Sequence, residues 1–310
     1  MKNILHTIVL PVCNSRDTLE LLVERVSKVM NDAQILFELV LVDDGSDDGS
    51  FEEICRLSKS YPFVRGIRLS RNFGHQAALV IGLEKSRGDF IAIIDDDLQD
   101  PPEILPEFFR RLYLDVDVVY GIRRKRKEKP IKKFLYAAFY RILRILSKVN
   151  IPLDAGDFCV MKRSVVEAML QFQEVNPFLR GIRSWVGFKQ VGVEYEQNPR
   201  LHGQSTYTIK KYFTLAVTGI LSFSYIPLRL ATLCGTVTAL IGFVFAVYVV
   251  CLWLIGPFDV PGYASLIVVI TFLGGVQLIT IGILGEYLAR LSDNVRNRSV
   301  AVVAETTLEE

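Results

Sequence analysis

Two clusters of carboxylates stand out in this 310-residue chain, because each directly follows a short apolar run. The first is Asp43-Asp44-Gly45-Ser46-Asp47-Asp48-Gly49. Carboxylates at the end of a buried strand can accept hydrogen bonds from a nucleobase N–H or a ribose hydroxyl; in a capped turn they accept them from backbone N–H groups instead. We expect Asp47 and Asp48 only to cap the turn, and we favour ligand binding for Asp43 and Asp44.

The second cluster is Asp95-Asp96-Asp97-Leu98-Gln99-Asp100, which two prolines follow. In an extended segment alternate residues share a face, so Asp95, Asp97 and Gln99 are predicted to point together and Asp96 to point away. Three oxygen ligands on one face suit Mg²⁺ or Mn²⁺, with substrate phosphates completing the coordination shell. The alternative is a solvated acidic loop, but the position at a strand end favours the metal site.

Three other segments carry residues whose role the sequence leaves open. Asp157, in the segment Asp154-Ala155-Gly156-Asp157, is either a turn residue or a contact to a nucleophile. The segment Arg200–Tyr207 places an Arg, a His and a Ser around a glycine, which suits a phosphate at a lipid surface as well as a linker turn. His75 follows an apolar run and fits a structural role as well as a place in the site.

Alternating strand and helix patterns supply the scaffold for these residues. Helical patterns include Asp17–Met30, where Asp17 and Glu20 form a capping-box arrangement, and Glu103–Arg111, with Asp100 as a candidate N-cap. Repeated strand–helix units predict a doubly wound α/β domain, in which ligands bind beyond the carboxyl ends of the strands. Short apolar, β-branched runs predict strands at His6–Val12, Phe37–Val42, Val64–Leu69, Phe90–Ile94 and Val116–Tyr120.

The C-terminal third contains two long runs without a charged residue, Leu230–Phe258 and Val260–Gly285. About 20 residues of helix cross the hydrocarbon core of a bilayer, so each run is long enough to span a membrane. Two buried core helices are the alternative, but core helices seldom run this long without a charge. Lys and Arg flank both runs on their outer sides and are absent from the loop between them, which places both chain ends in the cytosol.

These patterns divide the chain into four parts. Residues 1–206 are predicted to form a cytosolic α/β domain, which includes a basic amphipathic helix at 131–149 that suits an anionic membrane surface. Residues 207–228 are predicted to form a juxtamembrane amphipathic helix, 229–290 a two-helix transmembrane hairpin, and 291–310 a cytosolic tail. The chain is therefore expected to be a multi-pass protein with two spans.

Composition and absent motifs exclude several classes of protein. The net charge is +2, which is lower than expected for a nucleic-acid binder. The five cysteines form no C-x-x-C pair, so neither a zinc site nor a disulfide framework is indicated. The sequence contains no Walker A motif, no G-x-G-x-x-G after the first strand and no G-x-S-x-G, which argues against a P-loop motor, a dinucleotide oxidoreductase and a lipase.

Six segments, in this order along the chain, match one known family: Pro11-Val12-Cys13-Asn14, Val42–Ser46, Asp95–Pro102, Gly156-Asp157-Phe158, Phe178–Trp185 and Arg200–Tyr207. Taken together and in order, these motifs resemble glycosyltransferase family 2. Within the family, the chain resembles the polyprenyl-phosphate glycosyltransferases, the group of dolichol-phosphate mannose synthase and the bactoprenol glucosyltransferases, with two C-terminal spans as in the bactoprenol branch. Cys159 departs from the mannose synthases, which often have Arg at that position.

The resemblance implies a GT-A fold and a set of site residues. It implies Asp157 as the catalytic residue, whether as a base or as an orienting group. Nucleotide-sugar contacts are implied at Pro11, Cys13, Asn14, Asp43, Asp44, Asp95 and Asp96. Metal ligands are implied at Asp95, Asp97 and Gln99, with Mg²⁺ or Mn²⁺ as the cofactor, and acceptor-phosphate contacts at Arg123, Arg200 and Ser205.

The expected reaction is inverting transfer of one sugar to a polyprenyl phosphate, such as undecaprenyl phosphate, on the cytosolic face of a bacterial inner membrane. The resemblance favours UDP-glucose as the donor. Transfer to another lipid, such as diacylglycerol, is the alternative within enzymes; a non-catalytic scaffold or flippase subunit is the alternative outside them. Membrane lipids are expected partners, nucleic acid is not, and the sequence leaves the oligomeric state open.

Overall fold

The computed structural model describes residues 5–124, 155–172, 174–175, 177–197, 226–255, 262–296 and 298–307. The predicted helix at 131–149 and nearly all of the segment 207–228 lie outside these residues, as do Arg200 and Ser205. What the sequence predicts for those segments therefore stays a prediction.

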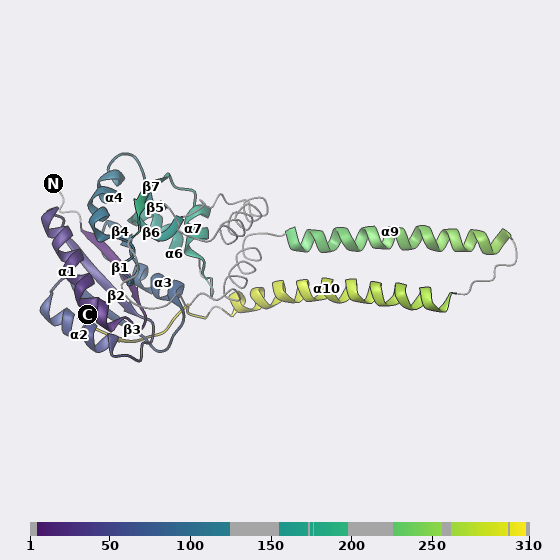
Figure 1. The fold of residues 1–310 in the computed structure, drawn as a ribbon, viewed down its shortest axis with the longest axis horizontal. Coiled ribbons are helices and arrows are strands. Elements are labelled where there is room, and N and C mark those ends of the chain that lie inside the picture. The colour runs from purple at the N-terminus through teal and green to yellow at the C-terminus, as the bar shows by residue number, and fades with distance from the viewer. Residues whose placement is uncertain are drawn as a thin grey trace.

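An eight-stranded sheet forms the centre of the α/β domain, in the order β7-β5-β6-β4-β1-β2-β3-β8 (Figure 1). β6 and β8 run opposite to the other strands, so the sheet is mostly parallel. The α/β class and the mostly parallel sheet are therefore confirmed. The strands are β1 (His6–Val12), β2 (Phe37–Asp43), β3 (Val64–Leu69), β4 (Phe90–Ile93), β5 (Val118–Arg124), β6 (Ala155–Lys162), β7 (Gln190–Glu196) and β8 (Val303–Thr306).

Helices cover both faces of this sheet. Along β1, Ile8, Leu10 and Val12 pack on one face and Val9 on the other, as the two-residue period of a strand requires. The first face is covered by α1 (Arg16–Asp32), α2 (Ser50–Ser60) and α4 (Leu105–Leu112). A short 3₁₀ turn, Pro102–Ile104, directly precedes α4. The second face is covered by α3 (His75–Lys85), α6 (Arg163–Leu170) and α7 (Leu179–Trp185).

Some predicted element boundaries and caps are wrong. The fifth strand starts and ends later than predicted, because β5 pairs with β7 over Val118–Arg124. The predicted capping box at Asp17 and Glu20 does not form: α1 begins at Arg16 after Ser15, and Glu20 pairs instead with Arg56 on α2, 2.7 Å away. Asp100 does not cap the following helix either, because its carboxylate binds groups of β5 and β7.

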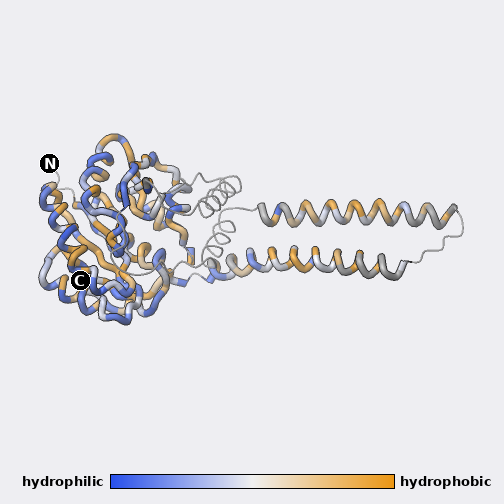
Figure 2. The backbone as a smooth tube through the Cα atoms, viewed as in Figure 1, coloured by the Kyte–Doolittle hydropathy of each residue, from blue (hydrophilic) through white to orange (hydrophobic). Residues whose placement is uncertain are grey.

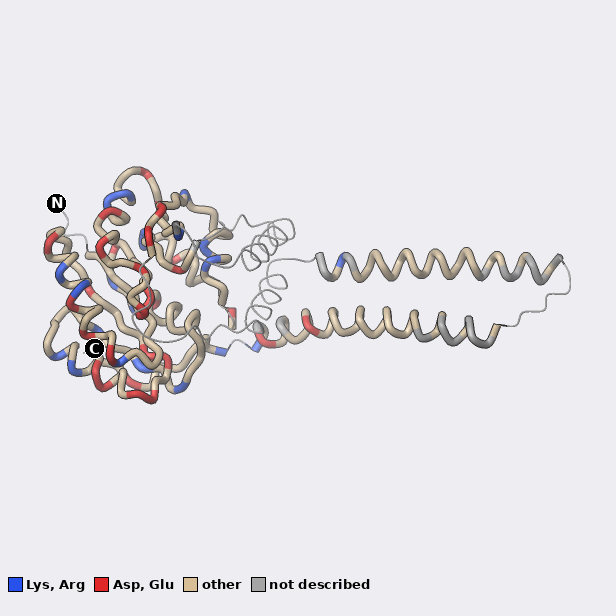
Figure 3. The backbone as a smooth tube through the Cα atoms, in the orientation of Figure 1, with Lys and Arg blue, Asp and Glu red and all other residues tan. Residues whose placement is uncertain are grey.

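Two long helices extend away from the α/β domain as an antiparallel hairpin (Figure 1). They are α9 (Ile226–Ile255) and α10 (Tyr263–Val295), and the described part of each is apolar along most of its length (Figure 2). Among the described residues, one segment is long and apolar enough to cross a membrane, Phe272–Asp293, and Ala231–Phe245 is a shorter apolar helix. Among the described residues of α9 and α10, the charged ones lie near the domain end of the hairpin (Figure 3).

The C-terminal segment returns from α10 to the sheet, where the sequence predicts only a tail. β8 pairs antiparallel with β3, and the N–H of Ser70 donates to the carbonyl of Val302 at 2.9 Å. Residues 5–124, 155–197 (except 173 and 176) and 298–307 therefore belong to the same α/β domain. The start of α9 and the end of α10 lie on the same side of the α/β domain (Figure 1).

Candidate active site

The predicted site residues lie at one edge of the sheet, where several strands end. Parallel pairing of β1 with β2 and β4 brings Cys13-Asn14, Asp44 and Asp95 to that edge. Because β6 runs antiparallel to β4, it begins at the same edge and places Asp157 there. This is the carboxyl edge of the parallel strands, where open α/β sheets bind ligands.

The carboxylates that follow β2 are bound to backbone N–H groups. Asp43 is fully buried; its Oδ1 accepts from the N–H of Ser46 at 3.2 Å, and its Oδ2 lies 3.7 Å from Nε of Arg68. Asp44 accepts from the N–H groups of Phe73 at 2.7 Å and Gly74 at 2.9 Å. These two carboxylates therefore hold the turn after β2 and the loop after β3, and their predicted contacts to a nucleotide stay a prediction.

Cys13 and Asn14, which follow β1, are hydrogen-bonded to both acidic clusters. The side chain of Asn14 accepts from the N–H of Asp47 at 3.1 Å, and the N–H of Asn14 donates to Oγ of Ser46 at 3.0 Å. Pro11 lies where β1 still pairs with β2 but no longer with β4, so the missing N–H of proline costs no bond to β4. Cys13 is exposed beside these groups.

The segment after β4 is a turn, so the prediction of an extended segment with alternating faces is wrong. Leu98 has φ +57°, a left-handed conformation that costs a non-glycine residue about 1–3 kcal/mol, and its side chain is buried. Asp96 turns toward β1 and accepts from the N–H of Cys13 at 3.2 Å and the hydroxyl of Ser15 at 2.5 Å. Asp97 accepts from the N–H of Gln99 at 3.1 Å.

Asp95 and Asp157 face a common histidine. Nε2 of His75, at the start of α3, lies 3.6 Å from Oδ1 of Asp95 and 3.6 Å from Oδ2 of Asp157. Burial lowers the pKa of His75, but Asp157 and Asp95 outweigh it and raise that pKa to about 9. The structure thus places His75 in the site, a role that the sequence left open.

Asp157 is held as a carboxylate by groups from two helices. Nε of Arg180 on α7 lies 3.1 Å from Oδ1 of Asp157, and Nε2 of Gln76 on α3 donates to Oδ2 at 3.3 Å. Burial raises the pKa of Asp157, but Arg180 and His75 outweigh it and hold that pKa well below its usual range. Gln76 also accepts from the N–H of Leu179, so one amide side chain joins α3, β6 and α7.

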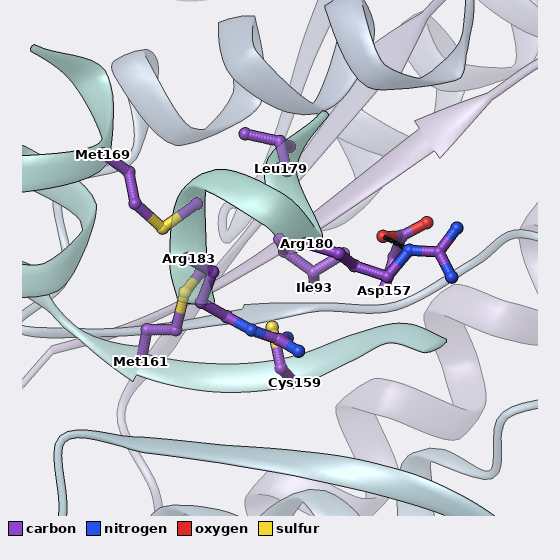
Figure 4. A pocket seen from close by; sticks show the side chains of 8 residues that line it. All are labelled: Ile93, Asp157, Cys159, Met161, Met169, Leu179, Arg180 and Arg183. Atoms are coloured by element: carbon purple, nitrogen blue, oxygen red, sulfur yellow. Dashed lines mark ion pairs between the residues drawn. The ribbon is translucent and has the colours of Figure 1, made fainter. Parts of the chain in front are cut away.

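A small pocket lies beside Asp157, between β4, β6 and α7 (Figure 4). Its lining is apolar except for Asp157 and the guanidinium groups of Arg180 and Arg183 (Figure 4). Arg183 is 2% exposed and packs over the ring of Tyr120, 5.2 Å from its centroid. The remaining lining residues are Ile93, Cys159, Met161, Met169 and Leu179.

Arg123, a predicted contact to the acceptor phosphate, faces an acid of the loop after β4. Its Nη2 lies 3.6 Å from Oδ2 of Asp100, and its Nε donates to the hydroxyl of Tyr195 at 3.3 Å. The guanidinium therefore has partners within the protein. A contact from Arg123 to a phosphate stays a prediction.

The carboxylates around Asp95 suit a hard divalent cation. One oxygen each of Asp95 and Asp100 is buried and accepts no hydrogen bond. Burial raises the pKa of Asp95 to about 7, with repulsion from Asp100, Asp157 and Asp97 adding to the shift. Oxygen ligands of this kind are those that Mg²⁺ and Mn²⁺ prefer. Among the described residues, no three His, Cys, Asp or Glu side chains converge to hold a metal by themselves, so substrate oxygens would have to share the coordination.

Several residues of this site could not be recognised from the sequence. Gln76 and Tyr195 were not singled out, and Arg180 and Arg183 appeared only within the family motif Phe178–Trp185. No local pattern marks them, because Gln76 and Arg180 reach Asp157 from α3 and α7 through the tertiary fold alone.

Comparison with known proteins identifies the family. The family model "Glycosyl transferase family 2" matches residues 7–170. The chain is 39% identical to the uncharacterized glycosyltransferase YkcC of Bacillus subtilis, over 98% of this chain and 95% of that protein. It is 36% identical to the SfII prophage-derived bactoprenol glucosyl transferase of Shigella flexneri, over 97% of each chain.

The chain therefore belongs to glycosyl transferase family 2, and it is a glycosyltransferase. Its similarity to bactoprenol glucosyl transferases over nearly the full length fits the polyprenyl-phosphate branch of the family. Among solved structures, glucosyl-3-phosphoglycerate synthase of Mycobacterium tuberculosis aligns with 70% of this chain and 78% of its own, at 18% identity and a TM-score of 0.46.

Proposed function

We propose that this enzyme transfers a single sugar from a nucleoside diphosphate sugar to a polyprenyl phosphate, with inversion and with the help of Mg²⁺ or Mn²⁺. UDP-glucose is the proposed donor and undecaprenyl phosphate the proposed acceptor. The observation that carries the proposal is the convergence of Asp95 and Asp157 on His75 at the carboxyl edge of the sheet, within 3.6 Å. The full-length similarity to bactoprenol glucosyl transferases supports the choice of acceptor.

The donor would bind at the ends of β1, β2 and β4. Pro11, Cys13, Asn14, Asp43, Asp44 and Asp96 form the proposed nucleotide-sugar contacts. Asp95, Asp97 and Gln99 would hold the metal, which supplies positive charge to the leaving diphosphate. Burial and, after it, repulsion from neighbouring carboxylates raise the pKa of Asp95, which supports this assignment because a nearby cation would stabilise the charged form.

The acceptor is already a nucleophile near neutral pH. The second pKa of a phosphate monoester is near ~6, so its oxygen is largely ionised and needs no strong general base. Arg180 and His75 keep Asp157 ionised, which suits a group that orients the reactants better than one that removes a proton. Arg123, Arg200 and Ser205 are the proposed contacts to the acceptor phosphate.

Repulsion between the two substrates is the main obstacle to this reaction. Two unit negative charges 4 Å apart repel by roughly 4 kcal/mol at an effective dielectric constant of 20. Arg180 and Arg183 on α7 and Arg123 on β5 gather positive charge around Asp157 and Asp100. This charge would lower the cost of bringing an anionic acceptor to an anionic donor.

The hairpin of α9 and α10 would anchor the enzyme in a bacterial inner membrane as two spans. Large apolar side chains such as Phe243, Phe245 and Leu278 are 62–72% exposed along it, which is costly in water and favourable in lipid. The positive-inside rule places the catalytic domain of residues 1–206, the amphipathic segment 207–228 and the tail 291–310 on the cytosolic side. Transfer to another lipid, such as diacylglycerol, is the second candidate.

The proposal is tested by transfer of radiolabelled glucose from UDP-glucose to undecaprenyl phosphate by the purified full-length enzyme. We expect label in the lipid fraction with Mg²⁺ or Mn²⁺ and none with EDTA. Diacylglycerol replaces the polyprenyl phosphate in a parallel reaction. Transfer that persists in EDTA would contradict the metal requirement, and transfer only to diacylglycerol would contradict the acceptor.

A further inference from the structure

Asp100, the last residue of the loop after β4, is fully buried, and side chains from two other strands bind its carboxylate. Its Oδ1 accepts a short hydrogen bond from the hydroxyl of Tyr195 on β7, and its Oδ2 lies 3.6 Å from Nη2 of Arg123 on β5. Arg123 in turn donates from Nε to the same tyrosine hydroxyl at 3.3 Å. Tyr195 thus accepts from one charged group and donates to the other.

The ring of Tyr195 is fixed independently of its hydroxyl. It packs edge-to-face on Phe158 with the centroids 5.4 Å apart, and it lies so close to Gly121 that a Cβ there would be 2.5 Å from the ring. Tyr195 is 4% exposed. The packing of the ring therefore fixes the position of the hydroxyl beside Asp100, and a phenylalanine at position 195 can keep the same packing.

The backbone of the loop 95–100 has a conformation that its own residues do not favour. Leu98 lies at φ +57°, between Asp97 and Asp100, and a leucine adopts this conformation only where surrounding contacts impose it. Two features hold it here. The Leu98 side chain is buried, and the carboxylate of Asp100 is bound by Tyr195 and Arg123, which together we call the clamp. A further contact from Nε2 of Gln197, just after β7, reaches Oε1 of Gln99 at 3.3 Å.

We propose that Tyr195 is a positioning residue that sets the divalent-metal affinity of the loop 95–100 by clamping Asp100 together with Arg123. The clamp keeps the turn at Leu98 in the shape that presents Asp95 and Asp97 to a metal. The inference rests on the proposed metal-dependent function, because it assigns the metal to this loop. It adds β5 and β7, which carry no ligand to the metal, to the groups that govern metal binding.

The experiment is calorimetric titration of Mn²⁺ into the full-length enzyme in the presence of UDP, for the wild type and for Tyr195→Phe. We expect the Kd for Mn²⁺ to rise about tenfold in Tyr195→Phe, while the Kd for UDP measured without metal stays within twofold. Tyr113→Phe is the matched control, because Tyr113 is 57% exposed and packs its ring on Phe90, at the opposite end of β4 from the loop. It should bind Mn²⁺ as the wild type does.

Asp100→Asn provides a second variant. If the tyrosine acts through Asp100, adding Tyr195→Phe to Asp100→Asn should weaken Mn²⁺ binding by less than twofold further. A lower melting temperature of Tyr195→Phe with an unchanged Kd for Mn²⁺ would show a merely structural role and overturn the inference. A wild type that binds no Mn²⁺ with UDP would overturn it too.

The sugar-transfer assay separates this inference from the proposed function. If the wild type transfers no sugar to any lipid but the tenfold difference in Mn²⁺ affinity is found, the proposed reaction fails and the role of Tyr195 stands. If transfer is metal-dependent but both proteins bind Mn²⁺ equally, the reaction stands and the role of Tyr195 fails.

Discussion

The turn after β2 and the loop after β4 carry similar clusters of aspartates, yet the fold uses them differently. In the turn after β2, Asp44 and Asp48 accept hydrogen bonds of 2.7–3.2 Å from backbone N–H groups. In the loop after β4, Asp95 keeps a buried oxygen without a hydrogen-bond donor, and burial raises its pKa to about 7. The carboxylate of Asp44 holds a loop through backbone donors, whereas Asp95 keeps an oxygen that receives no hydrogen bond from the described residues and faces the nearby His75.

The largest expected effect separates these two roles through activity. Asp97→Ala removes a proposed metal ligand, and because metal stabilisation of the leaving group amounts to several kcal/mol, sugar transfer should fall by about a hundredfold or more. Asp47→Ala should keep full transfer, because Asp47 contacts Asn14 through its backbone N–H, which alanine retains. Transfer rates at saturating donor measure both. Equal activity in the two variants would contradict the metal assignment.

The next effect concerns stability and belongs to the turn after β2. Asp44→Ala leaves the N–H groups of Phe73 and Gly74 without their acceptor, which should lower the free energy of unfolding by about 2–3 kcal/mol. Urea denaturation followed by circular dichroism measures the change, with Asp47→Ala as the control. A loss as small as that of the control would show that Asp44 does not hold the loop.

Two glycines of the same region give a matched pair. Gly45 has φ +67°, and a Cβ there would lie 2.5 Å from the carbonyl carbon of Arg71, so Gly45→Ala should cost about 2 kcal/mol from strain and overlap together. Gly74 has φ +100° and ψ 153°, a backbone region almost confined to glycine, but open space around the Cβ position. Gly74→Ala should therefore cost about 1 kcal/mol, from backbone strain without overlap. Thermal unfolding measures both. The reverse order would mean that overlap at Gly45 is relieved by movement of the loop.

The smallest effect is a pH dependence. Burial raises the pKa of Asp48, but hydrogen bonds from Ser50 and the N–H of Arg16 outweigh it and lower that pKa below 3.8. The carboxylate therefore stabilises the fold above about pH 4, and this contribution disappears as the pH falls through the lowered pKa. Asp48→Ala should lose less than about 1 kcal/mol at pH 6 and almost nothing near pH 2, because Asp48 is exposed. Equal losses at both pH values would contradict the assignment.

Five of the eight described strands could be given bounds from the sequence, with small errors. The predicted strands His6–Val12 and Val64–Leu69 have the bounds found in the structure. His6–Val12 is buried throughout, as a strand covered on both faces requires, and Val64–Leu69 is buried except at Arg65 and Arg68. The capping box at Asp17 failed because Glu20 has a stronger partner, Arg56, on the neighbouring helix. β8 was missed because an edge strand of four exposed residues has no apolar pattern to reveal it.

The sequence by itself determined the α/β domain, the acidic strand ends and the apolar hairpin, because period, composition and strand-end position are local properties. Only the tertiary structure decided which aspartates are neutralised. Asp44 meets the N–H groups of a loop after another strand, and Asp157 meets Gln76 and Arg180 from two helices. The partners of a carboxylate depend on residues far away in the sequence, and those partners fix whether the charge serves the fold or stays available for chemistry.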